Sequence, residues 1–213
     1  ERRNARYLPD FELPNPIIPT TELSSLATQA RDFVITVPSH AFRATLSALR
    51  QVLPEIDHHY RFCWGTKGLE ATSGKLLNEV FDEVIGQSAI RSALSGPSFA
   101  REVAARLPTA LTVAAIDSVE AEQFADWFRD HRTRIYTSGD LTGVQLGGAI
   151  KNVMAIAAGI SDGLGFGANA RAAVITRGLA EMVRLGIALG GQADTFQGLA
   201  GIGDLVLTCT DDQ

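Results

Sequence analysis

The chain has 213 residues, of which 46% are hydrophobic, so it is long enough to bury one large core or two modest ones. Its 24 acidic and 19 basic residues are interspersed along the sequence and give a formal net charge of −5. Because no basic stripe stands out, the composition argues against nucleic acid or an anionic membrane surface as a partner.

The first residues are charged and include no apolar leader, which predicts no secretory signal and favours a cytoplasmic location. Cys63 and Cys209 lie far apart without metal-ligand spacing, and we interpret them as small buried hydrophobes in a reducing compartment. The histidines are scattered, so we expect no metal site. In the apolar segment 141–161, the glycines and the single charge of Lys151 favour a buried helix over one that spans a membrane.

Residues 1–140 alternate between strand and helix patterns. The opening up to Pro19 holds too many prolines for a helix or a central strand, and we expect an irregular connection there. The alternation that follows predicts an α/β fold with a largely parallel sheet. The predicted strands cover residues 32–37, 61–65, 93–95, 110–114 and a short stretch around 135, and the predicted helices cover residues 21–29, 40–52, 76–84 and 118–130.

From residue 141 onward the strand patterns stop, and helical patterns replace them at residues 142–158, at residues 168–189 and near residue 195. This change predicts a domain boundary near Gly139, with residues 1–140 in the α/β part and residues 141–213 in an all-α part. The glycines of residues 163–167 superficially resemble a dinucleotide-binding fingerprint. No strand precedes them, so we interpret the segment as a loop between two helices.

Two loops that follow predicted strands are placed to meet a ligand, because ligands of open α/β sheets bind beyond the carboxyl ends of strands. Lys67 lies in the first loop, at residues 64–68. Gly96 and Ser98 lie in the second, at residues 95–100, where free N–H groups and the Ser98 hydroxyl suit an oxygen-rich ligand. A solvated lysine and an ordinary helix cap by Ser98 are the alternative interpretations.

Lys151 is the lone charge of the apolar helix predicted at 142–158, and the glycines three and four residues before it leave room beside it. A buried lysine is costly unless it is paired or used. Burial together with a nearby cation such as Lys67 favours the neutral amine that proton transfer needs. Asp204 lies amid glycines and aliphatic residues, where it can hold an ammonium or a substrate hydroxyl. A lysine that extends to solvent and a helix-capping aspartate are the alternatives.

Five segments stand in series along the chain: Val37-Pro38-Ser39-His40, Trp64-Gly65-Thr66-Lys67-Gly68-Leu69-Glu70, Ser95-Gly96-Pro97-Ser98-Phe99-Ala100, Gly143-Val144-Gln145-Leu146-Gly147-Gly148-Ala149-Ile150-Lys151-Asn152 and Gly201-Ile202-Gly203-Asp204-Leu205. In order and spacing they resemble the bacterial NAD(P)-dependent glycerol-3-phosphate dehydrogenase family. The resemblance extends over essentially the whole chain and includes residues 163–171 and 175–178. Such a series is far more specific than any single glycine motif.

The resemblance implies an incomplete Rossmann-type α/β domain with a mostly parallel sheet, followed by an all-α domain. It implies an oxidoreductase that interconverts dihydroxyacetone phosphate and sn-glycerol 3-phosphate with NADP or NAD, NADPH being favoured, and that supplies glycerol 3-phosphate for phospholipid synthesis. It also implies a small-molecule substrate. A homodimer is a possible assembly, and the sequence leaves the oligomeric state open. Carried over motif by motif, the resemblance makes Lys151 the catalytic proton donor or acceptor. It assigns substrate binding to Lys67, Gly96, Ser98, Lys151 and Asp204, and cofactor binding to Lys67 and Ala100. It assigns supporting hydrogen bonds to Asn152 and Thr208.

Two parts of the family pattern are expected outside this sequence. A glycine-rich phosphate loop should precede Glu1, and a Ser-Arg-Asn segment should follow Gln213, so we expect these 213 residues alone to be inactive. Two other interpretations stay open. One is a β-hydroxyacid dehydrogenase of the 6-phosphogluconate-dehydrogenase type, which also carries a lysine followed by asparagine on a helix, although segments 64–70 and 201–205 favour glycerol phosphate. The other is a non-catalytic ligand-binding module.

Overall fold

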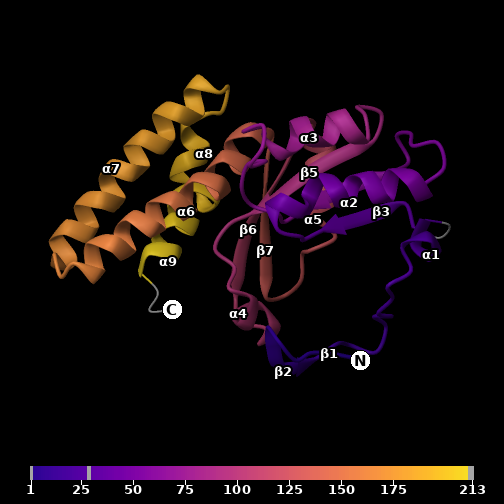
Figure 1. Cartoon of the computed structure of the whole chain (residues 1–213), viewed down its shortest axis with the longest axis horizontal. Helices are drawn as coiled ribbons and strands as arrows, with labels where there is room; N and C mark the ends of the chain where they lie inside the picture. The colour runs from indigo at the N-terminus through magenta and orange to yellow at the C-terminus, as the bar shows by residue number, and fades with distance from the viewer. Residues whose placement is uncertain (1, 28–29, 211–213) are drawn as a thin grey trace.

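The computed structural model describes residues 2–27 and 30–210, and its main feature is a five-stranded sheet in the first part of the chain (Figure 1). The strands lie in sequence order, and all neighbours are parallel except β5 and β6, which are antiparallel. The largely parallel sheet is thereby confirmed. The strands are β3 (Asp32–Ile35), β4 (Arg61–Trp64), β5 (Ile90–Ser95), β6 (Thr109–Ala115) and β7 (Thr133–Ser138).

Strand side chains alternate between the two faces of a sheet. Both faces of this sheet carry apolar side chains, and helices cover both. One face packs against α2 (Ser39–Val52) and α3 (Leu77–Val84), which bury Phe42 and Phe81 against the strands. On the other face, α5 (Ser118–Ala125) buries Phe124 against β6. The shorter helices of this part are α1 (Leu23–Ala27) and α4 (Ala100–Ala104).

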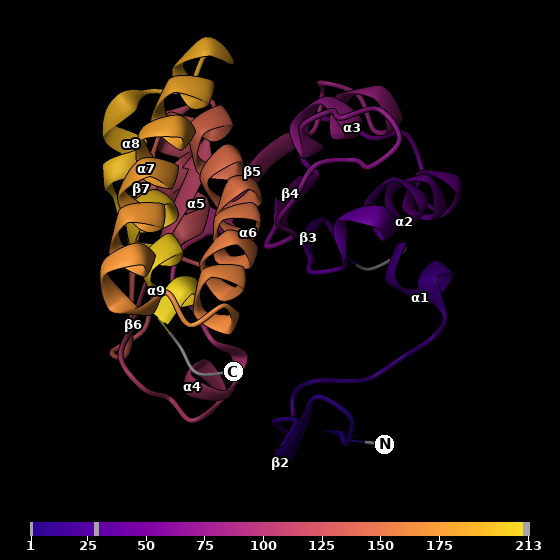
Figure 2. The same ribbon diagram turned by 60° about the vertical axis from the view of Figure 1, so that its left-hand side comes forward.

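The rest of the chain is helical. The long helices α6 (Leu141–Gly163) and α7 (Gly167–Ala188) lie side by side, joined by the glycine-containing loop that the sequence predicted (Figure 2). The chain then forms α8 (Ala193–Gln197), a π-helix η1 (Leu199–Gly203) and α9 (Asp204–Thr210). Helices α6, α7, α8 and α9 share a core that includes Met182 and Phe196.

Helix α6 is long and apolar enough to cross a membrane by length and composition, with a mean hydropathy of 1.2. In the structure it contacts β5, α7 and α9, and it buries Lys151. Lys151 is buried, but the expectation of a buried helix is met only in part, because Val153, Ile156 and Ile160 of α6 are exposed. Cys63 and Cys209 are both free and buried, as predicted.

Several local predictions need correction. The opening is not wholly irregular, because β1 (Arg3–Asn4) and β2 (Leu8–Glu12) form a small antiparallel hairpin. Pro9 is tolerated there, since a two-stranded hairpin leaves half of its backbone groups unpaired. The helix predicted at residues 118–130 ends at Ala125, and the end of the helix predicted at 21–29 lies outside the described residues. The antiparallel pairing of β5 with β6, the π-helix η1 and the helix α9 were not predicted.

Asp140 connects the sheet to the helical part. Its side chain is 5% exposed and caps α6 by accepting a hydrogen bond from the Gly143 N–H at 2.8 Å. The same carboxylate accepts bonds from the Gln192 N–H at 2.7 Å and the Thr195 hydroxyl at 2.6 Å. One buried carboxylate thus fixes both the start of α6 and the turn that leads into α8.

We expect Asp140→Ala to lower the free energy of unfolding by about 2 kcal/mol, because it removes a helix cap and leaves buried donors without an acceptor. Urea denaturation of the full-length protein measures this loss. The control is Asp117→Ala, which removes the exposed cap of α5 and should cost about 1 kcal/mol or less. Equal losses in the two variants would contradict the structural role given to Asp140.

Candidate functional site

Lys67 lies in the loop that follows β4, where the carboxyl ends of β3 and β4 meet. The preceding residue anchors the loop, since the Thr66 hydroxyl donates to the Val37 carbonyl oxygen at 2.7 Å. Gly68 follows with a φ of +126°, and a Cβ there would stand 2.9 Å from the Ser39 hydroxyl oxygen. Glycine is required at this position both for its backbone conformation and for the close approach to α2.

Lys151 projects from α6 toward the same place, and two glycines in the preceding turn make this possible. A side chain at Gly147 would collide with the backbone carbonyl of Ala200 in η1. A Cβ at Gly148 would lie 2.9 Å from the Ser95 hydroxyl oxygen and 3.3 Å from Cγ of Lys67. The two glycines therefore let α6 approach η1, β5 and the Lys67 side chain closely.

Asp204 brings the two lysines together. It begins α9, and its side chain is 1% exposed. Oδ1 accepts a hydrogen bond from Lys151 Nζ at 2.6 Å, and Oδ2 accepts one from Lys67 Nζ at 2.5 Å. One carboxylate therefore binds two ammonium groups from elements far apart in the sequence. The backbone of Asp204 ends η1, while its carboxylate contacts these two cations and accepts no helix-cap hydrogen bond from the described residues.

The three groups form an unbalanced charge cluster, since two ammoniums and one carboxylate sum to +1 when all are ionised. Burial lowers the pKa of Lys67, and the neighbouring charge of Lys151 lowers it further, while Asp204 opposes both effects. Lys151 Nζ also donates to the Thr208 hydroxyl oxygen at 2.9 Å, and that hydroxyl donates to the Asp204 carbonyl at 2.7 Å. The cluster can hold an anion and exchange a proton with it.

The segment after β5 lies beside Lys67. Gly96 has a φ of +134°, and its carbonyl oxygen accepts a hydrogen bond from Lys67 Nζ at 3.0 Å. Ser98 and Ala100 are exposed near the start of α4. The Ser98 hydroxyl donates to the Gly96 carbonyl at 3.2 Å, and Phe99 occupies the cap position, so the helix-cap interpretation of Ser98 is wrong.

One neighbour of the cluster was missed in the sequence. The Ser95 hydroxyl oxygen is buried beside Gly148 and has no hydrogen-bond partner within the described residues. No sequence signal distinguishes it from any other serine at the end of a strand. Of the weaker candidates, Thr208 contacts Lys151, whereas Asn152 is exposed on α6 and no hydrogen bond of its side chain is recorded.

Two other features lie apart from the lysine cluster. A pocket of about 380 Å³, lined by β6, β7, α8 and η1, contains no charged side chain and therefore lacks the chemistry of the cluster. Asp57, His58 and His59 bring three potential metal-ligand atoms within 4.8 Å of one another, a grouping that the sequence analysis did not single out. Both histidines are exposed, and His59 Nδ1 already lies 2.9 Å from an Asp57 oxygen.

Comparison with known proteins identifies relatives of the whole chain. The family model of the NAD-dependent glycerol-3-phosphate dehydrogenase N-terminus matches residues 1–121, and that of the C-terminus matches residues 140–213. Glycerol-3-phosphate dehydrogenase (NAD(P)+) of Alkalilimnicola ehrlichii is 56% identical over 213 residues, which are 100% of this chain and 63% of the relative. The Bartonella henselae protein of the same name is 51% identical, with coverage of 100% and 62%.

Solved structures agree with this assignment. The crystal structure of glycerol-3-phosphate dehydrogenase from Coxiella burnetii superimposes with a TM-score of 0.93 at 45% identity, and covers 100% of this chain and 64% of that one. Glycerol-3-phosphate dehydrogenase from Saccharomyces cerevisiae gives 0.84 at 29% identity, with coverage of 98% and 62%. The chain thus spans less than two thirds of these relatives. From its sequence, its fold and these matches, it belongs to the NAD-dependent glycerol-3-phosphate dehydrogenase family.

Proposed function

We propose that the full-length protein containing this chain interconverts dihydroxyacetone phosphate and sn-glycerol 3-phosphate with NADP or NAD. The observation that carries the proposal is that the buried Lys151 and the partly buried Lys67 share the Asp204 carboxylate. Family membership supplies the reaction, and the cluster supplies the groups that the reaction needs.

Lys151 is the proton-transferring residue in this proposal. Reduction of a ketone builds negative charge on its oxygen, and an ammonium at Lys151 neutralises that charge by giving up a proton. In the reverse direction the neutral amine accepts the proton of the alcohol. Asp204 and Thr208 hold Nζ in place through hydrogen bonds of 2.6 and 2.9 Å.

Lys67 binds the substrate and the cofactor in this proposal, and Asp204, Gly96 and Ser98 bind the substrate. The net positive charge of the cluster favours a substrate that carries phosphate, because a buried cation is stabilised by an anion brought close to it. Lys67 Nζ is held by the Asp204 carboxylate and the Gly96 carbonyl. An ammonium has three N–H donors, so one donor of Lys67 Nζ is left for an oxygen of the ligand.

The residues around the cluster fit a nicotinamide cofactor. β3, β4 and β5 are parallel, so their carboxyl ends and the loops that follow them meet at one edge of the sheet. Lys67 lies at that edge, and the Ser95 hydroxyl, which has no hydrogen-bond partner among the described residues, is buried at the end of β5. Lys67 and Ala100 would hold the cofactor, which supplies or accepts the hydride when bound.

With this activity we propose a cytoplasmic location and a homodimer. The exposed apolar side chains of Val153, Ile156 and Ile160 on α6 support burial of that helix face against further protein. Analytical ultracentrifugation of the full-length protein tests the dimer. A mass of one subunit across micromolar concentrations would reject it.

The first prediction for this function concerns Lys151. In the full-length protein, Lys151→Ala should lower kcat for dihydroxyacetone phosphate by at least about 100-fold, because it removes the group that gives the proton. The initial rate of NADPH or NADH oxidation measures this. Lys151→Arg should be similarly impaired, since a guanidinium keeps the positive charge but does not release a proton near neutral pH. Activity near wild type in either variant would reject proton transfer by Lys151.

The second prediction concerns Asp204. Asp204→Asn leaves the buried Lys151 ammonium and the partly buried Lys67 ammonium facing each other without a carboxylate, and should lower the free energy of unfolding at pH 7 by about 3 kcal/mol. The pKa of Lys67 is lower in the folded state than in the unfolded state, so the folded state releases the Lys67 proton at a lower pH. The free energy of unfolding therefore rises with pH until the ordinary lysine pKa is reached. We therefore expect the deficit of Asp204→Asn to shrink between pH 7 and pH 10. A deficit that is independent of pH in urea denaturation would contradict the shared-carboxylate arrangement.

A further inference from the structure

We propose that the ion pair between Arg43 of α2 and Glu70 is a positioning device for Lys67, an inference that rests on the proposed function. The pair lies outside the lysine cluster. Among the described residues, neither Arg43 nor Glu70 forms a hydrogen bond with Lys151 or Asp204. The pair fixes the loop from which Lys67 projects, and so determines where the Lys67 ammonium meets a ligand.

The loop after β4 is anchored on both sides of Lys67. One residue before it, the Thr66 hydroxyl binds the Val37 carbonyl. Three residues after it, Glu70 closes the loop on itself, since its N–H donates to the Lys75 carbonyl at 3.0 Å and its carbonyl accepts from the Gly74 N–H at 2.8 Å. Lys67 thus lies on a short span between two fixed points.

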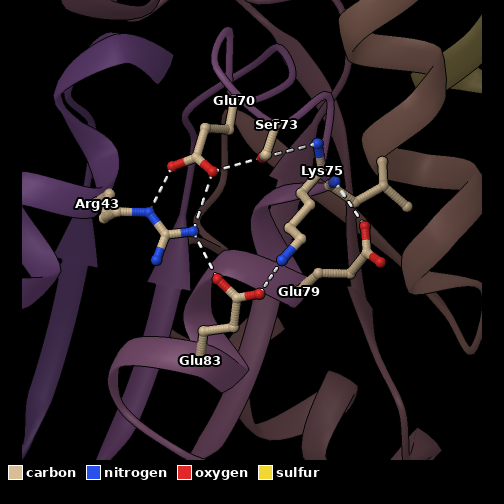
Figure 3. A network of polar contacts seen from close by, with 7 residues as sticks. Arg43, Glu70, Ser73, Lys75, Glu79 and Glu83 are labelled. Carbon is tan, nitrogen blue, oxygen red and sulfur yellow. Dashed lines mark hydrogen bonds and ion pairs between the residues drawn. The ribbon is translucent and has the colours of Figure 1, made fainter.

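The Glu70 side chain ties the second anchor to the body of the α/β part (Figure 3). Arg43 Nε and one terminal nitrogen donate to the two Glu70 oxygens at 2.6 and 2.9 Å, which is the two-pronged geometry that fixes a carboxylate most firmly. The Ser73 hydroxyl donates to the same carboxylate at 2.5 Å. Arg43 also binds Glu83 of α3 at 2.6 Å, and Glu83 pairs with Lys75. The loop is therefore held against two helices.

One face of α2 carries both contacts to this loop. Ser39 packs against Gly68, and Arg43, one turn later on the same face, binds Glu70. Hydrogen bonds from Arg43 and Ser73 lower the pKa of Glu70 to about 2, so the carboxylate stays charged and the pair stays formed at neutral pH. The Glu70 side chain is 12% exposed and that of Arg43 38%, so the contact that holds the pair in place is the two-pronged geometry rather than burial.

A small displacement of Lys67 has a measurable cost, because groups that bind a ligand must be placed to a fraction of an ångström. Lys151 projects from α6 and does not move with the loop. Loosening the loop should therefore weaken substrate binding more than the chemical step. In the full-length protein, Glu70→Gln should raise KM for dihydroxyacetone phosphate by about tenfold and lower kcat by less than about threefold.

The matched control is Glu122→Gln on α5. Glu122 also accepts hydrogen bonds from an arginine and a hydroxyl, Arg129 and Thr137, but has no contact with the Lys67 loop. It should leave KM unchanged. Arg43→Lys, which keeps the charge and loses the two-pronged contact, should raise KM less than Arg43→Met does. An equal rise of KM in Glu122→Gln, or an unchanged KM in Glu70→Gln, would overturn the proposal.

Two readouts separate this proposal from the proposed function. Hydrogen exchange at the Glu70 and Gly74 amides should accelerate in Glu70→Gln, and the NMR titration of the Lys67 ammonium should shift, whereas Glu122→Gln should change neither. If the wild-type protein does not reduce dihydroxyacetone phosphate, the proposed function fails, and these two measurements still decide the proposal. Faster exchange with an unshifted Lys67 titration would show that the pair stabilises the loop without positioning Lys67, and would reject the proposal.

Discussion

The buried carboxylate of Asp204, shared between two ammonium groups, is the interaction on which the rest of this structure depends. A buried lysine and a partly buried one can lie next to each other only if a counter-charge lies between them, since each unpaired charge costs several kcal/mol when it leaves water. Lys67 is 137 residues from Asp204 in the chain, and Lys151 is 53 residues away. The fold must therefore bring a strand-end loop, a long helix and the start of a short helix to one point. The close contacts of α6 serve that requirement.

Small residues make this convergence possible. Gly147 admits the backbone of η1, and Gly148 admits the stem of Lys67, so two adjacent positions of one helix face two different partners. Asp140 then fixes the start of the same helix by accepting a hydrogen bond from the N–H of the buried Gly143. A helix capped by a buried carboxylate and packed through glycines has little freedom to slide or rotate. The position of Lys151 is in this sense determined by residues that carry no chemistry of their own.

The sequence could predict what depends on local patterns. Strand and helix periodicity located most elements within a few residues, and a single charge in an apolar helix singled out Lys151. It could not predict that both lysines bind the same carboxylate, because that contact depends on tertiary geometry with no trace in spacing. The antiparallel step between β5 and β6 was equally hidden, since an isolated strand pattern does not encode the direction of its neighbour. Ser95 was missed for the same reason, as its burial without a partner comes from the packing of α6.

The two lysines are held in different ways, and this difference matters for the chemistry proposed for them. Lys151 stands on the buried face of a long helix that packs against β5, α7 and α9, where its position is as rigid as that packing. Lys67 stands on a loop, whose position depends on a few polar contacts such as that between Arg43 and Glu70. A group that exchanges a proton must keep its distance from the reacting oxygen, whereas a group that binds substrate and cofactor has to accommodate ligands that enter and leave. In the proposed function the rigid element carries the proton donor, and the loop carries the binding cation. Both lysines bind the Asp204 carboxylate, and this contact couples them. A ligand that draws Lys67 toward itself weakens the hydrogen bond between Lys67 and Asp204, and the carboxylate then interacts more strongly with Lys151.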